Sequence, residues 1–172
     1  MTGLRSHLTA HFAVGEPDVA SVTFLGLEPI DVLRFGPDPR GVSHYVSVGG
    51  SRRTEGTPAE VVVSLRTAAH LPGLARNVAV VGAAPAVEGL VLTPDALVDL
   101  GRPLWQNAPF TAVLLSPSEI EGINGIEFVA ATPVTATEAA WVRLKGVDAM
   151  RRAWREDGVD VLDPKRPAAQ PR

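Results

Sequence analysis

The side chains of this chain that best suit catalysis or metal binding are histidines. Two of them lie on a predicted helix, and a third follows a serine. His7 and His11 are four positions apart in a segment of helical periodicity, so both imidazoles share one helix face. A zinc site would need a third ligand from His44, His70 or a carboxylate, and the glutamate of an H-E-x-x-H helix is absent. The pattern therefore favours a solvated helix face over a metal site.

Hydrolytic and acid–base chemistry are not indicated either. Ser43 and His44 are neighbours on a predicted strand, and adjacent strand residues point to opposite faces, so the histidine cannot activate that serine. Of the carboxylates Glu60, Glu127 and Glu138, only Glu138 has a clear local role, as the last residue of a T-x-x-E capping box. We expect a protein that is not an enzyme and uses no cofactor.

The glycine-rich segment Gly49-Gly50-Ser51-Arg52-Arg53 has two interpretations. Consecutive glycines let the backbone present several N–H groups to one anion, and the arginines add positive charge. The Gly-Lys-Ser/Thr end of a phosphate-binding loop is missing, so a nucleotide site is not indicated. Turn chemistry favours a glycine hairpin between two strands, with solvated arginines, over an anion-binding nest.

Tyr45 has a stronger claim to a binding role. It alternates with Ser43 and Ser47, so its ring is expected on the less apolar strand face, at solvent or at a partner. A tyrosine there is either a half-exposed strand residue or an anchor for a partner chain. His44 faces the apolar side of the strand. The rival interpretation is a small-ligand site or hydrolase formed by His44, Tyr45 and Arg52.

Composition excludes several classes of function. The 172 residues, 45% of them hydrophobic, suffice for one domain core. A net charge of −3 and a pI near 5.8 leave no basic surplus for a nucleic-acid groove. With 0 cysteines, thiol chemistry is excluded.

The first segment is an amphipathic helix rather than a signal peptide, and the longest apolar run, Val78 to Val87, is too short to span a membrane. We expect a cytoplasmic protein, and its preference for arginine over lysine is typical of GC-rich bacterial genomes.

Apolar patterning predicts one domain over residues 1–163 and a flexible tail over 164–172, which cannot bury apolar area. Strands are expected at 19–25, 30–35, 42–48, 60–65, 90–92, 110–115 and 126–131. Helices are expected over 1–12, over 73–84 with Pro85 as its stop, and in two segments after Thr135 that end at Gly146 and Gly158. These elements predict an α/β fold of the α+β type. It is a single layered domain whose mixed, mostly antiparallel sheet of about six to eight strands packs with helices.

Several segments resemble, in order and spacing, the suppressor of fused family. They are His-Tyr-Val-Ser-Val-Gly at 44–49, Ala59 to Arg66, Leu71 to Val78, Pro103-Leu104 before Ala112 to Leu115, and Gly125 to Glu138. No one segment is a sharp motif, so the resemblance rests on their collinearity from Val42 to Trp154.

This resemblance implies a mixed α/β domain that binds proteins. Animal members look like two-domain regulators that hold a short peptide, partly by strand addition, and this chain is similar to their N-terminal domain. Stand-alone bacterial members resemble immunity proteins, which neutralise a toxin by binding it. The partner-contacting residues that the resemblance implies are Tyr45, Ser47, Ser51, Arg52, Glu60 and Arg66. We therefore expect a non-enzymatic domain whose partner is a protein or peptide, with a toxin as one candidate, and which binds neither nucleic acid nor membrane.

Overall fold

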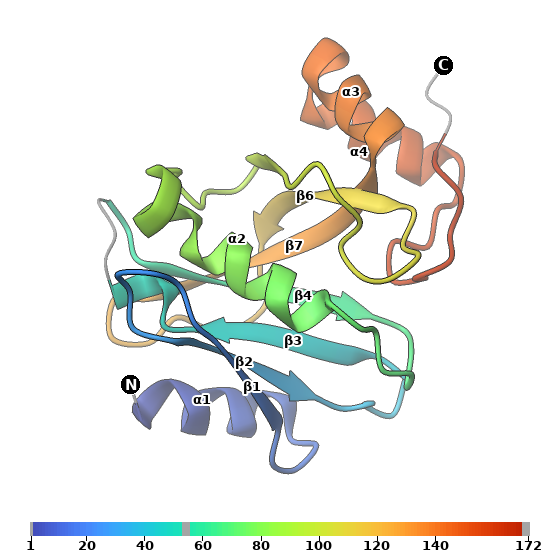
Figure 1. Ribbon diagram of the computed structural model, residues 1–172. Helices are drawn as coiled ribbons and strands as arrows, with labels where there is room; N and C mark the ends of the chain where they lie inside the picture. The colour runs from blue at the N-terminus through green and yellow to red at the C-terminus, as the bar shows by residue number, and fades with distance from the viewer. Residues whose placement is uncertain (1, 53–55, 170–172) are drawn as a thin grey trace.

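The first part of the chain forms a helix followed by four consecutive strands (Figure 1). The computed structural model describes residues 2–52 and 56–169. The elements are α1 Thr2–Phe12, β1 Asp18–Val22, β2 Ile30–Phe35, β3 Ser43–Val48, the 3₁₀ turn η1 Gly50–Arg52, and β4 Ala59–Leu65. Each of these strands pairs antiparallel with the next, in keeping with the mostly antiparallel sheet that the sequence predicted.

The second part of the chain supplies three helices and three more strands. They are α2 Leu74–Glu88, β5 Leu97–Asp99, β6 Phe110–Pro117, β7 Glu127–Thr135, α3 Ala136–Lys145 and α4 Val147–Glu156. Within the described residues, no helix is long and apolar enough to cross a membrane.

The seven strands of the described residues belong to one sheet, in the order β1-β2-β3-β4-β7-β6-β5. The return of β7 to the side of β4 makes the one parallel pair among these strands, and the other neighbours are antiparallel. The predicted class, a layered α+β domain with a mixed and mostly antiparallel sheet, is confirmed. Strands β3 and β4 lie in the interior of the sheet, whereas β1 and β5 form its two edges.

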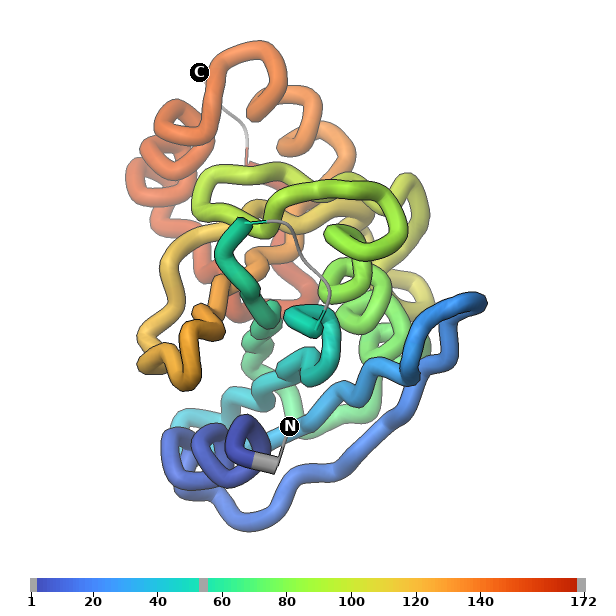
Figure 2. The backbone as a smooth tube through the Cα atoms, turned by 90° about the vertical axis from the view of Figure 1, so that its left-hand side faces the viewer, coloured from blue at the N-terminus to red at the C-terminus, as the bar shows by residue number. Residues whose placement is uncertain are grey.

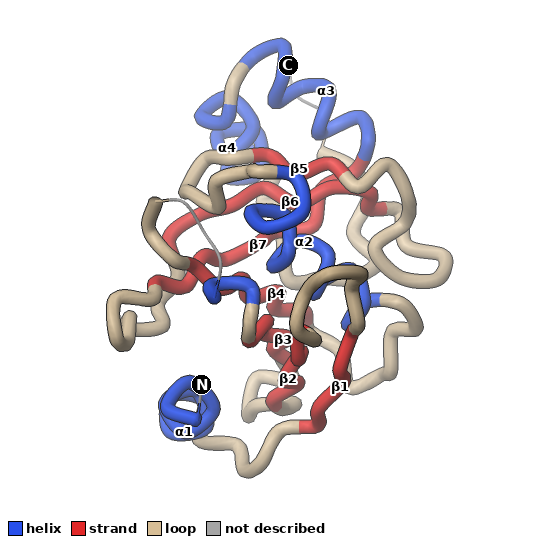
Figure 3. The backbone as a smooth tube through the Cα atoms, turned by 60° about the vertical axis from the view of Figure 1, so that its left-hand side comes forward, coloured by secondary structure: helices blue, strands red, loops and turns tan. Residues whose placement is uncertain are grey.

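Helices cover both faces of the sheet. On one face, α2 shares a core cluster with alternate residues of β4, such as Val61 and Val63. On the opposite face, Leu8 of α1 shares a second cluster with Val46, and Met150 of α4 shares a third with alternate residues of β6. Figure 2 shows α1 and the α3–α4 pair on the side of the sheet away from α2. Figure 3 shows α1 near β2 and the α3–α4 pair near β5 and β6.

Helix α2 runs past Pro85 to Glu88, so the expected end at residue 84 is wrong. The helix ends instead at Gly89, whose φ of 69° is the left-handed conformation that glycine adopts without strain. The Gly89 N–H donates to the Pro85 carbonyl at 3.1 Å. A proline one turn before such a cap removes one helical hydrogen bond without ending the helix.

The region after α2 also differs from expectation. No strand forms at 90–92, and β5, which the pattern did not predict, begins after a turn at Pro94 and Asp95. Asp95 has a φ of 74°, a left-handed conformation that marks this turn. A strand of three residues carries too little alternation to be recognised in a sequence.

Helices α3 and α4 have the capping residues that the sequence predicted. Thr135 Oγ1 accepts from the Glu138 N–H at 3.1 Å, and Glu138 Oε1 accepts from the Thr135 N–H at 2.9 Å, so the capping box is confirmed. Gly146 ends α3, and Gly158, with a φ of 62°, follows α4 in the left-handed conformation.

Residues 164–169 do not match the flexible tail that composition predicted. Arg166 is 3% exposed, and its guanidinium donates to both carboxylate oxygens of Glu138 at 2.9 Å. The Ala169 N–H donates to the same carboxylate at 3.1 Å. A buried charge pair of this kind ties the segment to the α3–α4 end of the sheet. Residues 170–172, also included in the expected tail, lie outside the described residues.

Candidate functional site

Tyr45 lies in the core rather than at a surface. It is 4% exposed and belongs to the cluster beneath α2, so the expected position of its ring at solvent is wrong. Its hydroxyl has no hydrogen-bond partner among the described residues, and the guanidinium of Arg34 lies 6.0 Å from the ring centroid. Alternation along β3 correctly separated Tyr45 from His44. It did not reveal that α2 covers the tyrosine face.

Glu60, Ser47 and Ser51 form a buried hydrogen-bond network at the end of β3. Three consecutive N–H groups, of Gly49, Gly50 and Ser51, donate to the Glu60 carboxylate at 2.9–3.2 Å. The Ser47 and Ser51 hydroxyls donate to it at 2.8 and 2.6 Å. The glycine-rich segment lies in the connection of the antiparallel β3–β4 hairpin, as the preferred interpretation predicted. Its N–H groups also form an anion nest, whose anion is the internal Glu60 carboxylate. Arg53 lies outside the described residues.

Arg52 and Arg66 are the exposed members of the six residues implied as partner contacts. Arg52 donates to the Pro29 carbonyl at 3.0 Å and pairs with Glu28, whereas Arg66 pairs with Asp160. The two arginines lie at opposite ends of the β3–β4 hairpin. Arg52 belongs to η1, which follows β3, whereas Arg66 follows β4, and the two strands run antiparallel. The six residues do not form one continuous surface, and their contact with a partner stays a prediction.

The rival site of His44, Tyr45 and Arg52 does not converge. His44 and Tyr45 point to opposite faces of β3, and Arg52 lies beyond the other end of that strand. The metal alternative also lacks a ligand set: His7 Nε2 is 2.5 Å from the Glu121 carbonyl, and His11 packs edge-on against Phe12. Across residues 2–52 and 56–169, no group of three or more His, Cys, Asp or Glu side chains could hold a metal ion.

A serine, a histidine and an aspartate do meet on the face of the sheet opposite α2. Ser64 Oγ is 2.7 Å from His44 Nδ1, and Asp38 Oδ2 is 3.1 Å from His44 Nε2. The strand register places His44 directly opposite Ser64. The ring of Phe12 stacks on the imidazole with centroids 4.5 Å apart. Sequence reasoning considered the neighbouring serine and missed this one, because the pairing register of two strands is not visible in a sequence.

These three side chains line a cleft of about 430 Å³ between α1, β3, β4 and the segment that follows β6. Burial lowers the pKa of His44 below its ordinary value of 6.5 and outweighs Asp38, which raises it. Burial would raise the pKa of Asp38, but hydrogen bonds from His44, the Val42 N–H and Arg40 hold that pKa well below its ordinary 3.8. At neutral pH the site therefore holds a neutral imidazole and a carboxylate.

The low pKa of His44 makes stability depend on pH. Because the folded pKa lies below 6.5, the unfolded chain binds more protons as pH falls below that value. The contribution of His44 to the free energy of unfolding is therefore fully present above about pH 6.5. It decreases on acidification, by at most about 1.4 kcal/mol per pH unit. Urea unfolding between about pH 7.5 and 5.5 should show a steeper loss for the parent protein than for His44→Gln. The exposed His70→Gln is the matched control, and equal slopes for the parent and His44→Gln would contradict the assignment.

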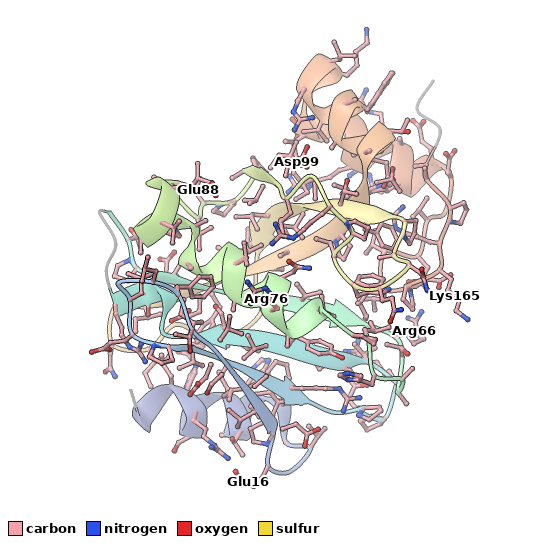
Figure 4. The ribbon with its side chains drawn as sticks, in the orientation of Figure 1. Glu16, Arg66, Arg76, Glu88, Asp99 and Lys165 are labelled. Atoms are coloured by element: carbon pink, nitrogen blue, oxygen red, sulfur yellow. The ribbon has the colours of Figure 1, made fainter. Side chains whose placement is uncertain are left out.

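A different surface gathers exposed apolar side chains. Val87, Leu90 and Val91 are 59%, 39% and 59% exposed, at the end of α2 and the start of the connection to β5. We call these three residues together with β5 the α2–β5 margin. In Figure 4 the labelled Glu88 and Asp99 mark its two parts on the same upper side of the molecule. Neighbouring exposed aliphatic side chains of this kind are typical of binding surfaces.

Strand β5 is open on its outer side, because it pairs only with β6 in the sheet of the described residues. Asp99 at its end accepts from Arg143 of α3 at 2.6 Å and from the Gly101 N–H at 2.9 Å. The hydrogen bond from Arg143 is the main reason that the pKa of Asp99 lies below its ordinary value. Arg143 thus fixes the end of an edge strand whose outer main-chain groups can meet another chain.

Comparison with known proteins identifies the fold. Residues 26–167 match a family model described as suppressor of fused protein. No curated protein sequence matches the chain.

Three solved structures share the fold at low sequence identity. A suppressor of fused homologue from Neisseria gonorrhoeae FA 1090 is 21% identical with a TM-score of 0.77, over 97% of this chain and 94% of that chain. A structure of the Sufu–Fu complex is 16% identical with a TM-score of 0.69, over 98% of this chain and 91% of that chain. Drosophila Suppressor of Fused is 16% identical with a TM-score of 0.67, over 96% of this chain but 50% of that chain, so this chain spans about half of the fly protein's length.

Proposed function

The chain belongs to the suppressor of fused family, and we propose from this premise that it is a protein-binding domain without catalytic turnover. The solved complex of Sufu with Fu is a precedent for a similar protein that holds a protein partner. One observation carries the proposal for this chain. Three exposed aliphatic side chains lie at the end of α2 and at the start of the connection that leads into the edge strand β5.

An edge strand and an adjacent apolar patch complement each other in peptide recognition. A partner segment that lies along β5 as an added strand would bond to its outer N–H and C=O groups, and these bonds supply affinity without sequence preference. Selectivity would come from side chains that meet Val87, Leu90 and Val91. Covering each of these half-exposed side chains contributes about 1 kcal/mol. Strand β3, favoured from sequence, cannot accept a strand because β2 and β4 already occupy both of its sides.

Charged side chains placed in the α2–β5 margin should strongly reduce capture of a partner. Val87→Lys combined with Val91→Lys should reduce the partner retained from native-cell extract at least about tenfold, because a lysine cannot be buried against an apolar partner without desolvation. Leu144 is 78% exposed on α3, so Leu144→Lys is a matched control that should retain the partner. Quantitative mass spectrometry of the captured proteins checks the result. Equal capture by both variants would move the interface elsewhere, and capture of nothing by the parent protein would overturn the proposed function.

For the biological role, we propose that the partner is a toxin, neutralised by binding in the cytoplasm. The support is the resemblance of stand-alone bacterial members of the family to immunity proteins. Co-expression tests this role: the chain should protect cells from a toxin encoded beside its own gene, and the Val87→Lys/Val91→Lys variant should not. Growth inhibition in the presence of the intact chain would point instead to a regulatory partner.

A further inference from the structure

The cleft beside α1 holds a hydrogen-bond chain that partner binding does not use. Asp38 is ionised, so His44 donates its Nε2 proton to it, and His44 Nδ1 is then the acceptor for the Ser64 hydroxyl. This tautomer is assigned from the hydrogen-bond network. The Asp38 carboxylate is itself held by the N–H groups of Arg40 and Val42 at 2.8 and 3.0 Å. Each member is therefore positioned by the next, as in an activated nucleophile, its base and its orienting acid.

We propose that Ser64 is a nucleophile that accepts an acyl group from small carboxylic esters bound in this cleft. The Ser64 oxygen attacks the ester carbonyl while His44 Nδ1 takes the hydroxyl proton, and a new C–O bond forms. The bond to the alcohol then breaks, and the alkoxide leaves with the proton held by His44. The products are an acyl-serine and a free alcohol, and no other reactant is required.

The walls of the cleft indicate the substrate class. Apolar side chains of Phe12, Val62, Ile120 and Leu162 face the space beside the polar group. A volume of about 430 Å³ suits a short apolar acyl or aryl group. Arg40 lies at the rim with 72% of its side chain exposed and pairs with Asp38 at 3.3 Å, so the rim of the cleft carries a cation that can attract a negatively charged substrate.

The location of Ser64 argues for slow acylation and against rapid turnover, because donors that stabilise the oxyanion assist both the acylation and the deacylation step. Ser64 lies within the regular strand β4, whereas serine hydrolases of the α/β type place the nucleophile on a tight turn that also supplies N–H donors to the oxyanion. The histidine also presents Nδ1 to the serine and Nε2 to the aspartate, the reverse of the usual hydrolase arrangement. The site is thus one for covalent modification, distinct from the α2–β5 margin and compatible with a non-enzymatic binding role.

The test uses the whole chain and p-nitrophenyl acetate. We expect stoichiometric release of p-nitrophenolate without further turnover, and an acetyl group on Ser64 that peptide mass mapping locates. Ser64→Ala should remove that adduct, and His44→Gln should slow its formation about 100-fold, the contribution of a general base. Ser6 is an exposed serine of α1 outside the lining of the cleft, so Ser6→Ala is the matched control and should react as the parent does.

The variant Asp38→Asn tests whether Asp38 positions His44 for acylation or only supports the fold. Because Asp38 raises the pKa of His44, its loss should move the rise of the acylation rate to lower pH and lower the plateau rate. Absence of an acetyl group on Ser64 would overturn the proposal. So would acetylation whose rate is unchanged in both His44→Gln and Asp38→Asn, with far-ultraviolet circular dichroism confirming that each variant is folded.

Discussion

Glu60→Leu is expected to lower the free energy of unfolding by about 4 kcal/mol or more. The wild-type carboxylate is 0% exposed and accepts five hydrogen bonds, from three backbone N–H groups and two serine hydroxyls. Leucine fills a similar volume but leaves all of those donors buried without acceptors, at about 1–3 kcal/mol for each that finds no water. Urea unfolding with linear extrapolation measures the change.

Two further variants sharpen this result. Glu60→Gln keeps one carbonyl oxygen but turns an NH₂ group toward donors, so we expect an intermediate loss of about 2 kcal/mol. The exposed Glu127→Gln is the control and should change stability by less than about 0.5 kcal/mol. A loss below about 1 kcal/mol for Glu60→Leu would show that the backbone and serine donors around Glu60 do not depend on its carboxylate for stability.

Arg166→Met should cost about 3–5 kcal/mol, because it leaves the Glu138 carboxylate buried without its charge partner. Arg166 is held between aromatic rings as well, with its guanidinium 4.9 Å from the Phe110 centroid and 5.6 Å from that of Trp154. The flexible methionine fills the space that the arginine stem occupied, so the loss reports on the polar contacts of the guanidinium, which are the ion pair with Glu138 and the hydrogen bonds to the Pro133 and Pro167 carbonyls. The neighbouring and exposed Lys165→Met is the matched control and should be nearly neutral.

This effect should fade in acid. Burial would raise the pKa of Glu138, but hydrogen bonds from Arg166, the Thr135 N–H and Trp154 outweigh burial and hold the pKa below its ordinary 4.5. The pair therefore contributes fully above about pH 4.5, and its contribution is lost as pH falls through the folded pKa. The gap in stability between parent and Arg166→Met should be wide near neutral pH and should narrow as pH falls through the folded pKa of Glu138, which lies below 4.5. A gap that is independent of pH would contradict the assignment.

Local pattern accounts for most of the fold. Strand β2 was predicted at its observed bounds because its apolar run is flanked by turn residues, and the cap at Thr135 was predicted because its partner is three residues away. The failures depend on distant partners. Nothing near Arg166 in the sequence indicates that Glu138 would hold it, and a short strand such as β5 is defined by its pairing with β6 rather than by its own three residues.

The candidate site was less accessible to sequence reasoning for the same reason. Alternation placed Tyr45 and His44 on opposite faces, but only the packing of α2 decides that the tyrosine face is core. The partner of His44 is set by strand register, and the role of Glu60 by a loop that folds over its carboxylate. The α2–β5 margin was hidden because residues 90–92 have the composition of a strand yet form an irregular connection in which Leu90 and Val91 are exposed.

Amide hydrogen exchange of the chain, free and bound to the protein it captures, tests the proposed binding role most directly. A partner strand laid along β5 would protect outer N–H groups that now face solvent and would cover the end of α2. The account predicts new protection concentrated in residues 97–99 and 87–92, with the β3–β4 hairpin unchanged. Protection confined to other surfaces, with the margin exchanging as in the free chain, would contradict it.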